Sequence, residues 1–202
     1  MRERNSLRAL SKRLPERPLA FILALKSITI TVSLTEAPVC RSEGSANTAI
    51  RIKAMRIWNS LSEYGIKFVA NPANPFEQAH DDPNFPVDYT QFPRETLRSK
   101  SGQCSDLTSL YAAMLEDSEV RVAVLDYPGH MTMMFDTEAE DAAEAGMPAD
   151  LLVEHDGTLW VPIEVTYIGK PFYDAVSKAA YAYKAEADKG RVKIYSLHKA
   201  WG

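Results

Sequence analysis

The chain has 202 residues, of which 46% are hydrophobic and 25% charged, with a formal net charge of −4 and a pI near 5.6. These values are typical of a globular protein and exclude a disordered or fibrous chain, and the absence of a basic stripe argues against nucleic acid as a partner. The two cysteines, Cys40 and Cys104, include no CxxC pair, so neither a structural zinc site nor a disulfide framework is expected. A single Cys40–Cys104 bridge in an oxidising compartment is the alternative.

The front of the chain differs in character from the rest. An apolar run at 19–25 stops at a lysine and no small-residue cleavage site follows, so there is no clean signal peptide, and the compartment, cytoplasmic or exported, is left open. Residues 28–34 alternate apolar and polar side chains, which predicts a strand too short and too polar to span a bilayer. Residues 41–47 look like a polar linker. We therefore divide the chain into an N-terminal extension, 1–47, and one domain, 48–202.

A helix opens the domain, with Asn47 or Thr48 as its expected cap. Apolar side chains recur at helical spacing at Ile50, Ala54, Ile57, Trp58 and Leu61. Gly65 is expected to end this helix, and residues 66–69 are expected to follow it as a short extended piece. Residues 71–93 contain five prolines among Asn and Asp, which predicts a long irregular loop of the kind that often forms part of a site.

The second half of the domain alternates between the two periodicities. A buried helix face is predicted after Cys104 by the apolar positions Leu107, Leu110, Tyr111, Met114 and Leu115. Further elements are expected as strands at 120–125 and 130–135, an acidic surface insertion or short helix at 136–149, a hairpin of 151–154 with 158–166, a helix at 172–187 and a strand at 192–196. Helices followed by an antiparallel meander predict an α+β fold.

Cys104 is the first candidate for chemistry. A glycine-containing loop, Ser101-Gly102-Gln103, delivers it to the first turn of the amphipathic helix. Free backbone N–H groups and the helix dipole favour negative charge there, so the pKa of the thiol is expected to fall and the thiolate to become a nucleophile near neutral pH. The alternative is a small buried hydrophobe, which is what most lone cysteines are.

A cysteine nucleophile needs a base, and the base needs an orienting group. The other histidines lie in the proline-rich loop (His80), in a hairpin turn (His155) and near the C-terminus (His198). His130 directly follows Pro-Gly and opens a strand, so its ring can project from a strand end. Glu164 is expected inside an apolar strand, where a buried carboxylate is costly unless a histidine on the neighbouring strand pairs with it. An ordinary edge-strand glutamate is the alternative.

Three segments resemble motifs of bacterial transglutaminase-like cysteine peptidases. Residues 88–117 are similar to their nucleophile segment, in which a Pro-x-Glu-Thr-Leu run and a Gly-Asp-Cys-x-Asp-Leu motif precede a helix. Tyr-Pro-Gly-His at 127–130 resembles their histidine motif. Trp-Val-Pro-Ile-Glu-Val-Thr at 160–166, with the Gly-x-x-Phe-x-x-Ala segment at 169–175, resembles their acidic motif. The similarity runs from about Ile50 to the C-terminus, with the motifs in family order.

The resemblance implies a papain-like α+β fold in which the nucleophile helix packs on an antiparallel sheet, and a Cys104–His130–Glu164 triad. It further implies that His130 takes the thiol proton, that the sulfur attacks an amide of a peptide or protein substrate, and that a thioester is resolved by water or an amine. The oxyanion hole would include the Cys104 backbone N–H, with Gln91 as a candidate second donor. No metal or cofactor is implied.

The chain departs from the family pattern beside the nucleophile. Gln103 and Ser105 stand where acidic residues are usual, whereas Asp106 is retained. The loss of two carboxylates favours the thiolate and predicts altered substrate contacts around Gln103. Because the family contains peptidases, cross-linking transglutaminases and inactive scaffolds, the sequence predicts a cysteine peptidase or amidase and leaves a transglutaminase or a non-catalytic binding module as alternatives. The oligomeric state is not predicted.

Overall fold

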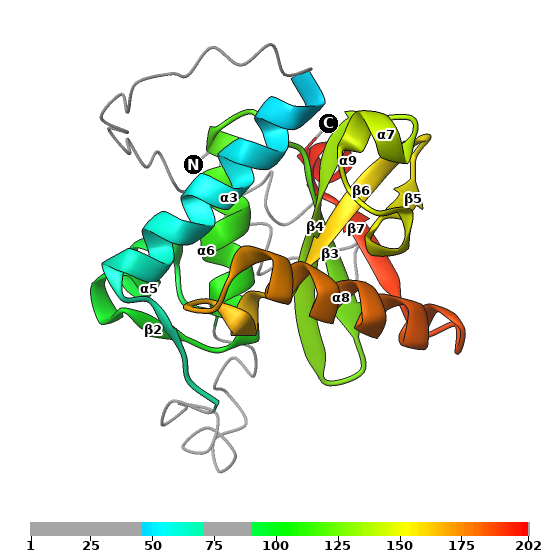
Figure 1. The fold of residues 1–202 in the computed structure, drawn as a ribbon. Helices are drawn as coiled ribbons and strands as arrows, with labels where there is room; N and C mark the ends of the chain where they lie inside the picture. The colour runs from blue at the N-terminus through cyan, green and yellow to red at the C-terminus, as the bar shows by residue number, and fades with distance from the viewer. Residues whose placement is uncertain (1–45, 71–89, 202) are drawn as a thin grey trace, which may run out of the picture.

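Residues 46–70 and 90–201 are described by the computed structural model, which combines helices with an antiparallel sheet and is of the expected α+β class (Figure 1). The predicted strand at 28–34, Cys40, His80 and most of the proline-rich segment lie outside the described residues. The domain boundary after residue 47 stays a prediction, and it falls in the first turn of helix α3 (Ala46–Tyr64).

Five strands form one antiparallel sheet in the order β5-β6-β4-β3-β7. Their bounds are Val122–Tyr127 (β3), His130–Ala139 (β4), Val153–His155 (β5), Thr158–Ile163 (β6) and Lys193–Ser196 (β7). A separate parallel pair joins β1 (Lys67–Phe68) to β2 (Ser101–Gly102), which ends two residues before Cys104. The other helical segments are α5 (Pro93–Ser99), α6 (Cys104–Asp117), α7 (Ala142–Ala145), η1 (Ala149–Leu151), η2 (Val165–Tyr167), α8 (Phe172–Ala187) and α9 (Leu197–Trp201).

The sheet is strongly curled, because its two edge strands approach each other. Strands β5 and β7 occupy opposite ends of the strand order, yet the His155 Nε2 atom lies 3.0 Å from Ser196 Oγ. The curl encloses a small apolar cluster that includes Leu125, Met134 and Trp160. The right-handed twist of adjacent strands, accumulated over five of them, brings the edges together.

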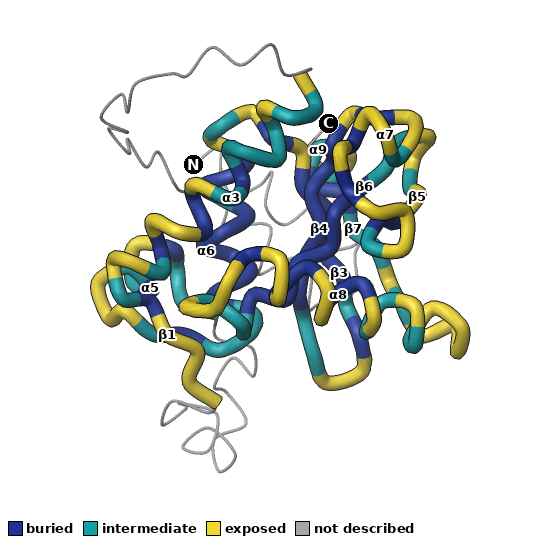
Figure 2. Tube along the Cα trace, in the orientation of Figure 1, coloured by how far each residue is buried: buried dark blue, intermediate teal, exposed yellow. Residues whose placement is uncertain are grey.

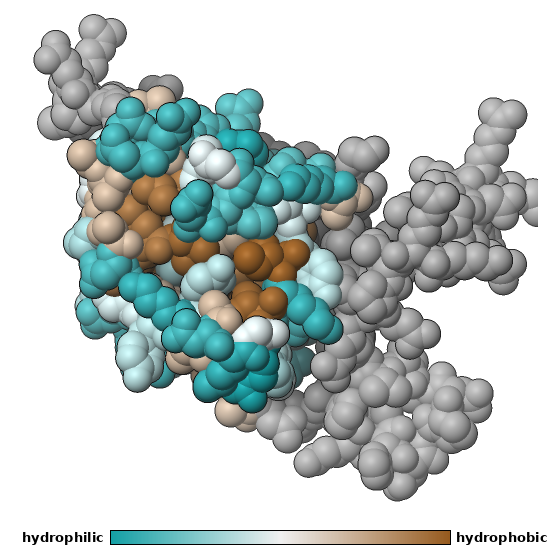
Figure 3. Space-filling view, turned by 90° about the vertical axis from the view of Figure 1, so that its right-hand side faces the viewer, coloured by the Kyte–Doolittle hydropathy of each residue, from teal (hydrophilic) through white to brown (hydrophobic). Residues whose placement is uncertain are grey.

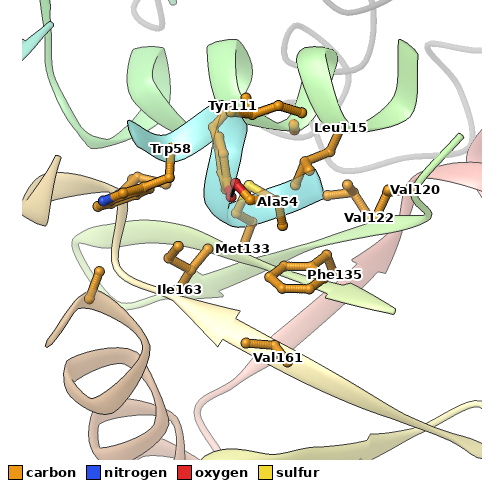
Figure 4. Close-up of a cluster of buried hydrophobic side chains, with 14 of the residues drawn as sticks. Ala54, Trp58, Tyr111, Leu115, Val120, Val122, Met133, Phe135, Val161 and Ile163 are labelled. Carbon is orange, nitrogen blue, oxygen red and sulfur yellow. Dashed lines mark hydrogen bonds between the residues drawn. The ribbon is translucent and has the colours of Figure 1, made fainter. Parts of the chain in front are cut away.

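The main core lies between the other face of the sheet and helices α3, α6 and α8. Strand alternation sends Met133 and Phe135 into this core and Met134 to the opposite face. Trp58 and Tyr111 belong to the same core and contact each other edge to face, with ring centroids 5.5 Å apart (Figure 4). Burial is continuous from α6 through the central strands (Figure 2). Helix α6 is thereby clamped on the sheet, which fixes the position of its first residue, Cys104.

Some apolar side chains also reach the surface. The face on the right of Figure 1 carries several apolar residues between polar ones (Figure 3). Among the described residues, the large hydrophobic side chains with substantial exposure are Tyr64, Phe68, Val69, Tyr173 and Tyr181. Within the same residues, none of the helices has the length and apolar character needed to cross a membrane.

Several elements confirm the sequence predictions closely. Helix α8 has the expected bounds, α6 begins at Cys104 and Gly65 follows the last residue of α3 with a φ of 91°. The expected strands after residue 120 are all present, with ends shifted by a few residues. The predicted hairpin turn is also confirmed: Asp156 and Gly157 have φ angles of 54° and 85°, the left-handed values that a two-residue type I′ loop requires.

Two predictions about helix starts are wrong. Asn47 and Thr48 lie inside α3 and do not precede it. Pro93 was expected to close the irregular loop, but it is the first residue of α5, a helix that the proline count concealed. Proline is favoured at this position because the N–H that it lacks would have no helical partner there.

Two predictions about strands also need correction. The acidic stretch at 136–149 is not wholly a surface insertion, because β4 continues to its fourth residue and buries Asp136, which is 1% exposed. Arg121 neutralises this carboxylate at 2.5 Å. Strand β6 ends at Ile163, so Glu164 does not belong to a strand. This second correction places the acidic residue in a turn, with consequences for the site.

Candidate active site

Cys104 is the first residue of α6 and carries a half-buried free thiol. Burial alone raises the pKa of this thiol, because a thiolate is poorly solvated in the interior. Hydrogen bonds from the His130 ring and from the backbone N–H groups of Met131 and Ser105, together with the charge of His130, outweigh burial and lower the pKa below its ordinary value. The sulfur therefore lies in an environment that favours the thiolate.

His130 is the first residue of β4 and is held between a sulfur and a carboxylate. Its Nε2 atom lies 2.8 Å from Glu164 Oε2, which leaves Nδ1 as the nitrogen available to the Cys104 sulfur. These two partners raise the pKa of His130 to about 10, with the Cys104 hydrogen bond as the largest cause. The side chain is 32% exposed, so the ring borders solvent. The ring of Tyr127, the partner of His130 across the hairpin, stacks against it with centroids 6.2 Å apart.

The turn between β3 and β4 controls where the histidine emerges. Only Pro128 and Gly129 separate the paired residues Tyr127 and His130. Gly129 has a φ of 77°, which a residue with a side chain rarely adopts, and proline at the preceding position has a fixed φ. The Pro-Gly motif therefore holds the first residue of β4 in one position relative to α6.

Glu164 is buried, with 4% exposure, and caps the short helix η2. Its Oε1 atom accepts hydrogen bonds from the Thr166 backbone N–H at 3.1 Å and from the Thr166 hydroxyl at 2.7 Å, which leaves Oε2 for His130. The backbone N–H of Glu164 donates to the carbonyl of Ala175 in α8 at 3.1 Å. Burial raises the pKa of Glu164, but the hydrogen bonds from His130 and Thr166 lower it further than burial raises it. The carboxylate is thus ionised and fixed in orientation.

A gap in the sheet creates the space for these three residues. Strand β6 ends at Ile163, which pairs with Met133, so the first three residues of β4 have no neighbour on that side. The Thr132 hydroxyl donates to the Ile163 carbonyl and accepts from the Val165 N–H, in place of the missing ladder. The freed N–H of Met131 is directed to the Cys104 sulfur. The early end of β6 therefore lets the N-terminus of α6 enter the sheet edge.

The other two predicted site residues surround Asp106 in the first turn of α6. Gln91 donates its backbone N–H to Asp106 Oδ1 at 2.8 Å and its side-chain amide to Oδ2 at 3.1 Å. Gln103 donates its backbone N–H to Oδ2 at 2.9 Å. The structure thus brings Cys104, His130 and Glu164 into one constellation and places Gln91 and Gln103 beside it, where their oxyanion and substrate roles stay predictions.

Sequence reasoning missed three residues that support the constellation. Thr166 holds the Glu164 carboxylate, and Tyr127 stacks on His130. The Thr132 hydroxyl in β4 binds the Ile163 carbonyl at the point where β6 ends. The available signal was weak: Thr132 is a fully buried hydroxyl within an apolar strand, and such a group needs a hydrogen-bond partner. The partner itself depends on where β6 ends, and no residue pattern gave that position.

Comparison of the chain with family models, with curated proteins and with solved structures finds no significant match. The site is therefore interpreted from its own geometry. Among residues 46–70 and 90–201, no group of three or more His, Cys, Asp or Glu side chains is arranged to hold a metal ion. What the constellation offers chemically is a thiolate, an imidazolium beside it, and a carboxylate that orients the ring.

Proposed function

We propose that this protein is a thiol enzyme that hydrolyses amide bonds of peptides or proteins through Cys104, His130 and Glu164. The observation that supports it is that one imidazole has both partners: Glu164 lies 2.8 Å from Nε2, and the ring also forms a hydrogen bond with the Cys104 sulfur. A structural histidine needs only one such partner. A nucleophile, a base and an orienting carboxylate need this order.

The proposed reaction begins from the thiolate and imidazolium. The sulfur attacks the amide carbonyl carbon, and the oxygen becomes an oxyanion. His130 gives its proton to the amide nitrogen, the C–N bond breaks, and an amine leaves a thioester on Cys104. His130, now neutral, takes a proton from water, and the hydroxide releases the carboxylic acid and regenerates the thiolate. Glu164 holds the ring in one orientation throughout and stabilises its positive charge.

The same geometry supports the finer proposal that the fold is papain-like or transglutaminase-like. Its basis is a nucleophile at the start of a helix that packs on an antiparallel sheet, with the histidine on a neighbouring strand end. The resemblance of the three sequence motifs is an independent support. An amine that replaced water at the thioester would make the same site a transglutaminase.

Selective alkylation tests the proposal directly. Iodoacetamide at pH 7 is expected to label Cys104 much faster than Cys40, because the hydrogen bond and charge of His130 help to lower the thiol pKa of Cys104. His130→Ala should reduce labelling of Cys104 alone. Equal labelling of both cysteines, unaffected by that substitution, would contradict the proposal that the protein is a thiol enzyme.

The reaction type is tested by comparing proteomes treated with the wild-type protein and with Cys104→Ala. Hydrolysis of backbone amides predicts new peptide termini, and hydrolysis of side-chain amides predicts glutamine converted to glutamate, in the wild-type sample only. Isopeptide cross-links in place of these products would replace the hydrolase with a transglutaminase. Identical peptide sets in the two samples would count against catalysis on proteins.

A further inference from the structure

A carboxylate that the proposed reaction does not use lies in the first turn of the nucleophile helix. Asp106 is 2% exposed and accepts three N–H groups, from the Gln91 backbone, the Gln91 side chain and the Gln103 backbone. A buried carboxylate is costly unless such donors compensate it. It serves two segments at once: the residue just before the nucleophile and the segment that leads into α5.

The loop before the nucleophile is built to admit this carboxylate. A Cβ atom added at Gly102 would lie 2.7 Å from the Asp106 Cβ and 3.3 Å from its Oδ2. A Cβ atom essentially never has a contact under 3.0 Å, so only glycine lets the loop fold over the carboxylate so closely. The glycine in the Ser-Gly-Gln-Cys segment is therefore explained by packing against Asp106, since its φ is not positive.

The Gln91 amide is held at both ends. Its Nε2 donates to Asp106 Oδ2 at 3.1 Å, and its Oε1 accepts from the Ser99 hydroxyl at 3.3 Å. An amide nitrogen carries two N–H groups, and the second has no partner among the described residues. Oδ2 of the same carboxylate also accepts from the backbone N–H of Gln103, so the Gln91 amide and the residue adjoining Cys104 are held by one oxygen atom.

We propose that Asp106 is a positioning residue, whose carboxylate fixes the Gln91 amide beside the Cys104 backbone N–H so that the two N–H groups together bind the oxyanion. The proposal rests on the thioester chemistry proposed above. Asp106 itself does not contact the substrate. It acts through Gln91, whose amide it holds in place.

Two reagents separate this role from activation of the nucleophile. Acylation by p-nitrophenyl acetate passes through a tetrahedral oxyanion: the sulfur bonds to the carbonyl carbon, and p-nitrophenolate leaves. Alkylation by iodoacetamide displaces iodide in one step and forms no oxyanion. A defect of the oxyanion hole should therefore slow the first reaction and leave the second unchanged, whereas a defect in the thiolate or the fold should slow both.

We expect Gln91→Ala to slow the acylation burst about 100-fold and Asp106→Asn at least about ten-fold, with iodoacetamide rates within about two-fold of wild type. The double variant should be no slower than Gln91→Ala, because Asp106 acts only through the glutamine. Asp117→Asn, which changes an exposed carboxylate at the other end of α6, is the matched control and should change neither rate.

Additive effects of the two substitutions, or equal losses in both reactions, would overturn the positioning role. Gln91→Ala leaves the buried carboxylate in place, so it tests the role even where Asp106→Asn fails to fold; a normal burst in that variant also overturns the proposal. Failure of the proposed enzyme itself looks different: the wild-type protein would then show neither an acylation burst nor selective alkylation of Cys104.

Discussion

The molecule contains two clusters with nearly the same set of side chains. At the end of the sheet, Cys104 is grouped with His130 and Glu164. Across the sheet's edges, Ser196 is grouped with His155, whose Nε2 lies 3.0 Å from the serine Oγ and 3.3 Å from an Oδ2 of the adjoining aspartate, Asp156. Each cluster has a possible nucleophile, a histidine and a carboxylate, but the hydrogen-bond partners of the histidine are arranged differently in the two.

The difference lies in the ring nitrogens. In His130 the carboxylate takes Nε2, which leaves Nδ1 for the hydrogen bond with the sulfur, so a proton can pass at one nitrogen while the other is held. In the second cluster one nitrogen, His155 Nε2, faces both the hydroxyl and the carboxylate, and Asp156 is also bound by Lys199 at 2.6 Å. The first arrangement can serve as an acid–base relay, and the second joins β5 to β7 as a clamp. A list of residue types does not distinguish the two.

Removal of each histidine should give the largest difference between the two clusters. His130→Ala is expected to slow acylation of Cys104 by p-nitrophenyl acetate about 1000-fold, because it removes both the ion pair and the base. His155→Ala should leave that rate within about two-fold of wild type, as measured by stopped-flow release of p-nitrophenolate. Comparable losses in the two variants would mean that the site depends on the clamp.

Substitution of the carboxylate in each cluster should give the next largest difference in reactivity of Cys104. Glu164→Gln removes a charge that raises the pKa of His130, so this pKa should fall from about 10 toward its ordinary value near 6.5, and alkylation of Cys104 at pH 6 should slow about ten-fold. Asp156→Asn should change neither quantity. The measurement is an NMR titration of the His130 ring alongside iodoacetamide rates.

The raised pKa of His130 also predicts how the stability of the protein changes with pH. A histidine whose pKa is raised in the folded state contributes stability in full below its unfolded pKa, about 6.5, and loses it as the pH rises through about 10. The free energy of unfolding of the wild type should therefore exceed that of Glu164→Gln by more at pH 7 than at pH 10. A difference that grows between these values would contradict the assigned shift.

A smaller effect is expected from the threonines that support each histidine. Thr166→Val removes the 2.7 Å hydrogen bond to Glu164 Oε1 but keeps the backbone N–H bond, so alkylation and acylation should slow about three- to ten-fold. Thr158→Val removes contacts to the His155 carbonyl and to Trp160 at the clamp and serves as the matched control. Equal rates in the two variants would show that Thr166 does not orient the carboxylate.

The smallest effect on Cys104 should come from Ser196→Ala. It removes the hydroxyl that meets His155 across the two sheet edges, which should lower the free energy of unfolding by about 1 kcal/mol without any change in the alkylation rate. Urea unfolding curves, read beside the alkylation rates, check both parts. A slower reaction at Cys104 would show that closure of the curl influences the reactivity of this thiol.

Much of the site was predictable because its residues carry local signals. Cys104 follows a glycine-containing loop and opens an amphipathic helix, and His130 follows Pro-Gly at the start of a strand. Helix α8 was predicted with its exact bounds for the same reason, since its periodic apolar positions lie between a proline and a charged, glycine-containing segment. Glu164 was identified as the acid, but its setting was not: it caps a 3-10 turn and does not lie within a strand.

Other features could not be predicted, because they depend on contacts between distant segments. Asp136 looks like part of an acidic surface until Arg121, the residue just before strand β3, is seen beside it. His155 and Ser196 are 41 residues apart and meet only because the sheet curls. The role of Asp106 depends on Gln91, fifteen residues earlier, beyond the reach of helical periodicity. Periodicity finds the elements, and packing decides which side chains meet.

The early end of β6 places a natural probe beside the Cys104 sulfur. In a complete ladder the Met131 N–H would donate to a carbonyl on the next strand, but here it donates to the sulfur of Cys104. The Met131 amide thus senses the charge of the Cys104 sulfur. Its proton chemical shift and its rate of hydrogen–deuterium exchange should follow the conversion of thiolate to thiol or to acyl-enzyme, so the occupancy of the site can be followed without a label and before a substrate is known.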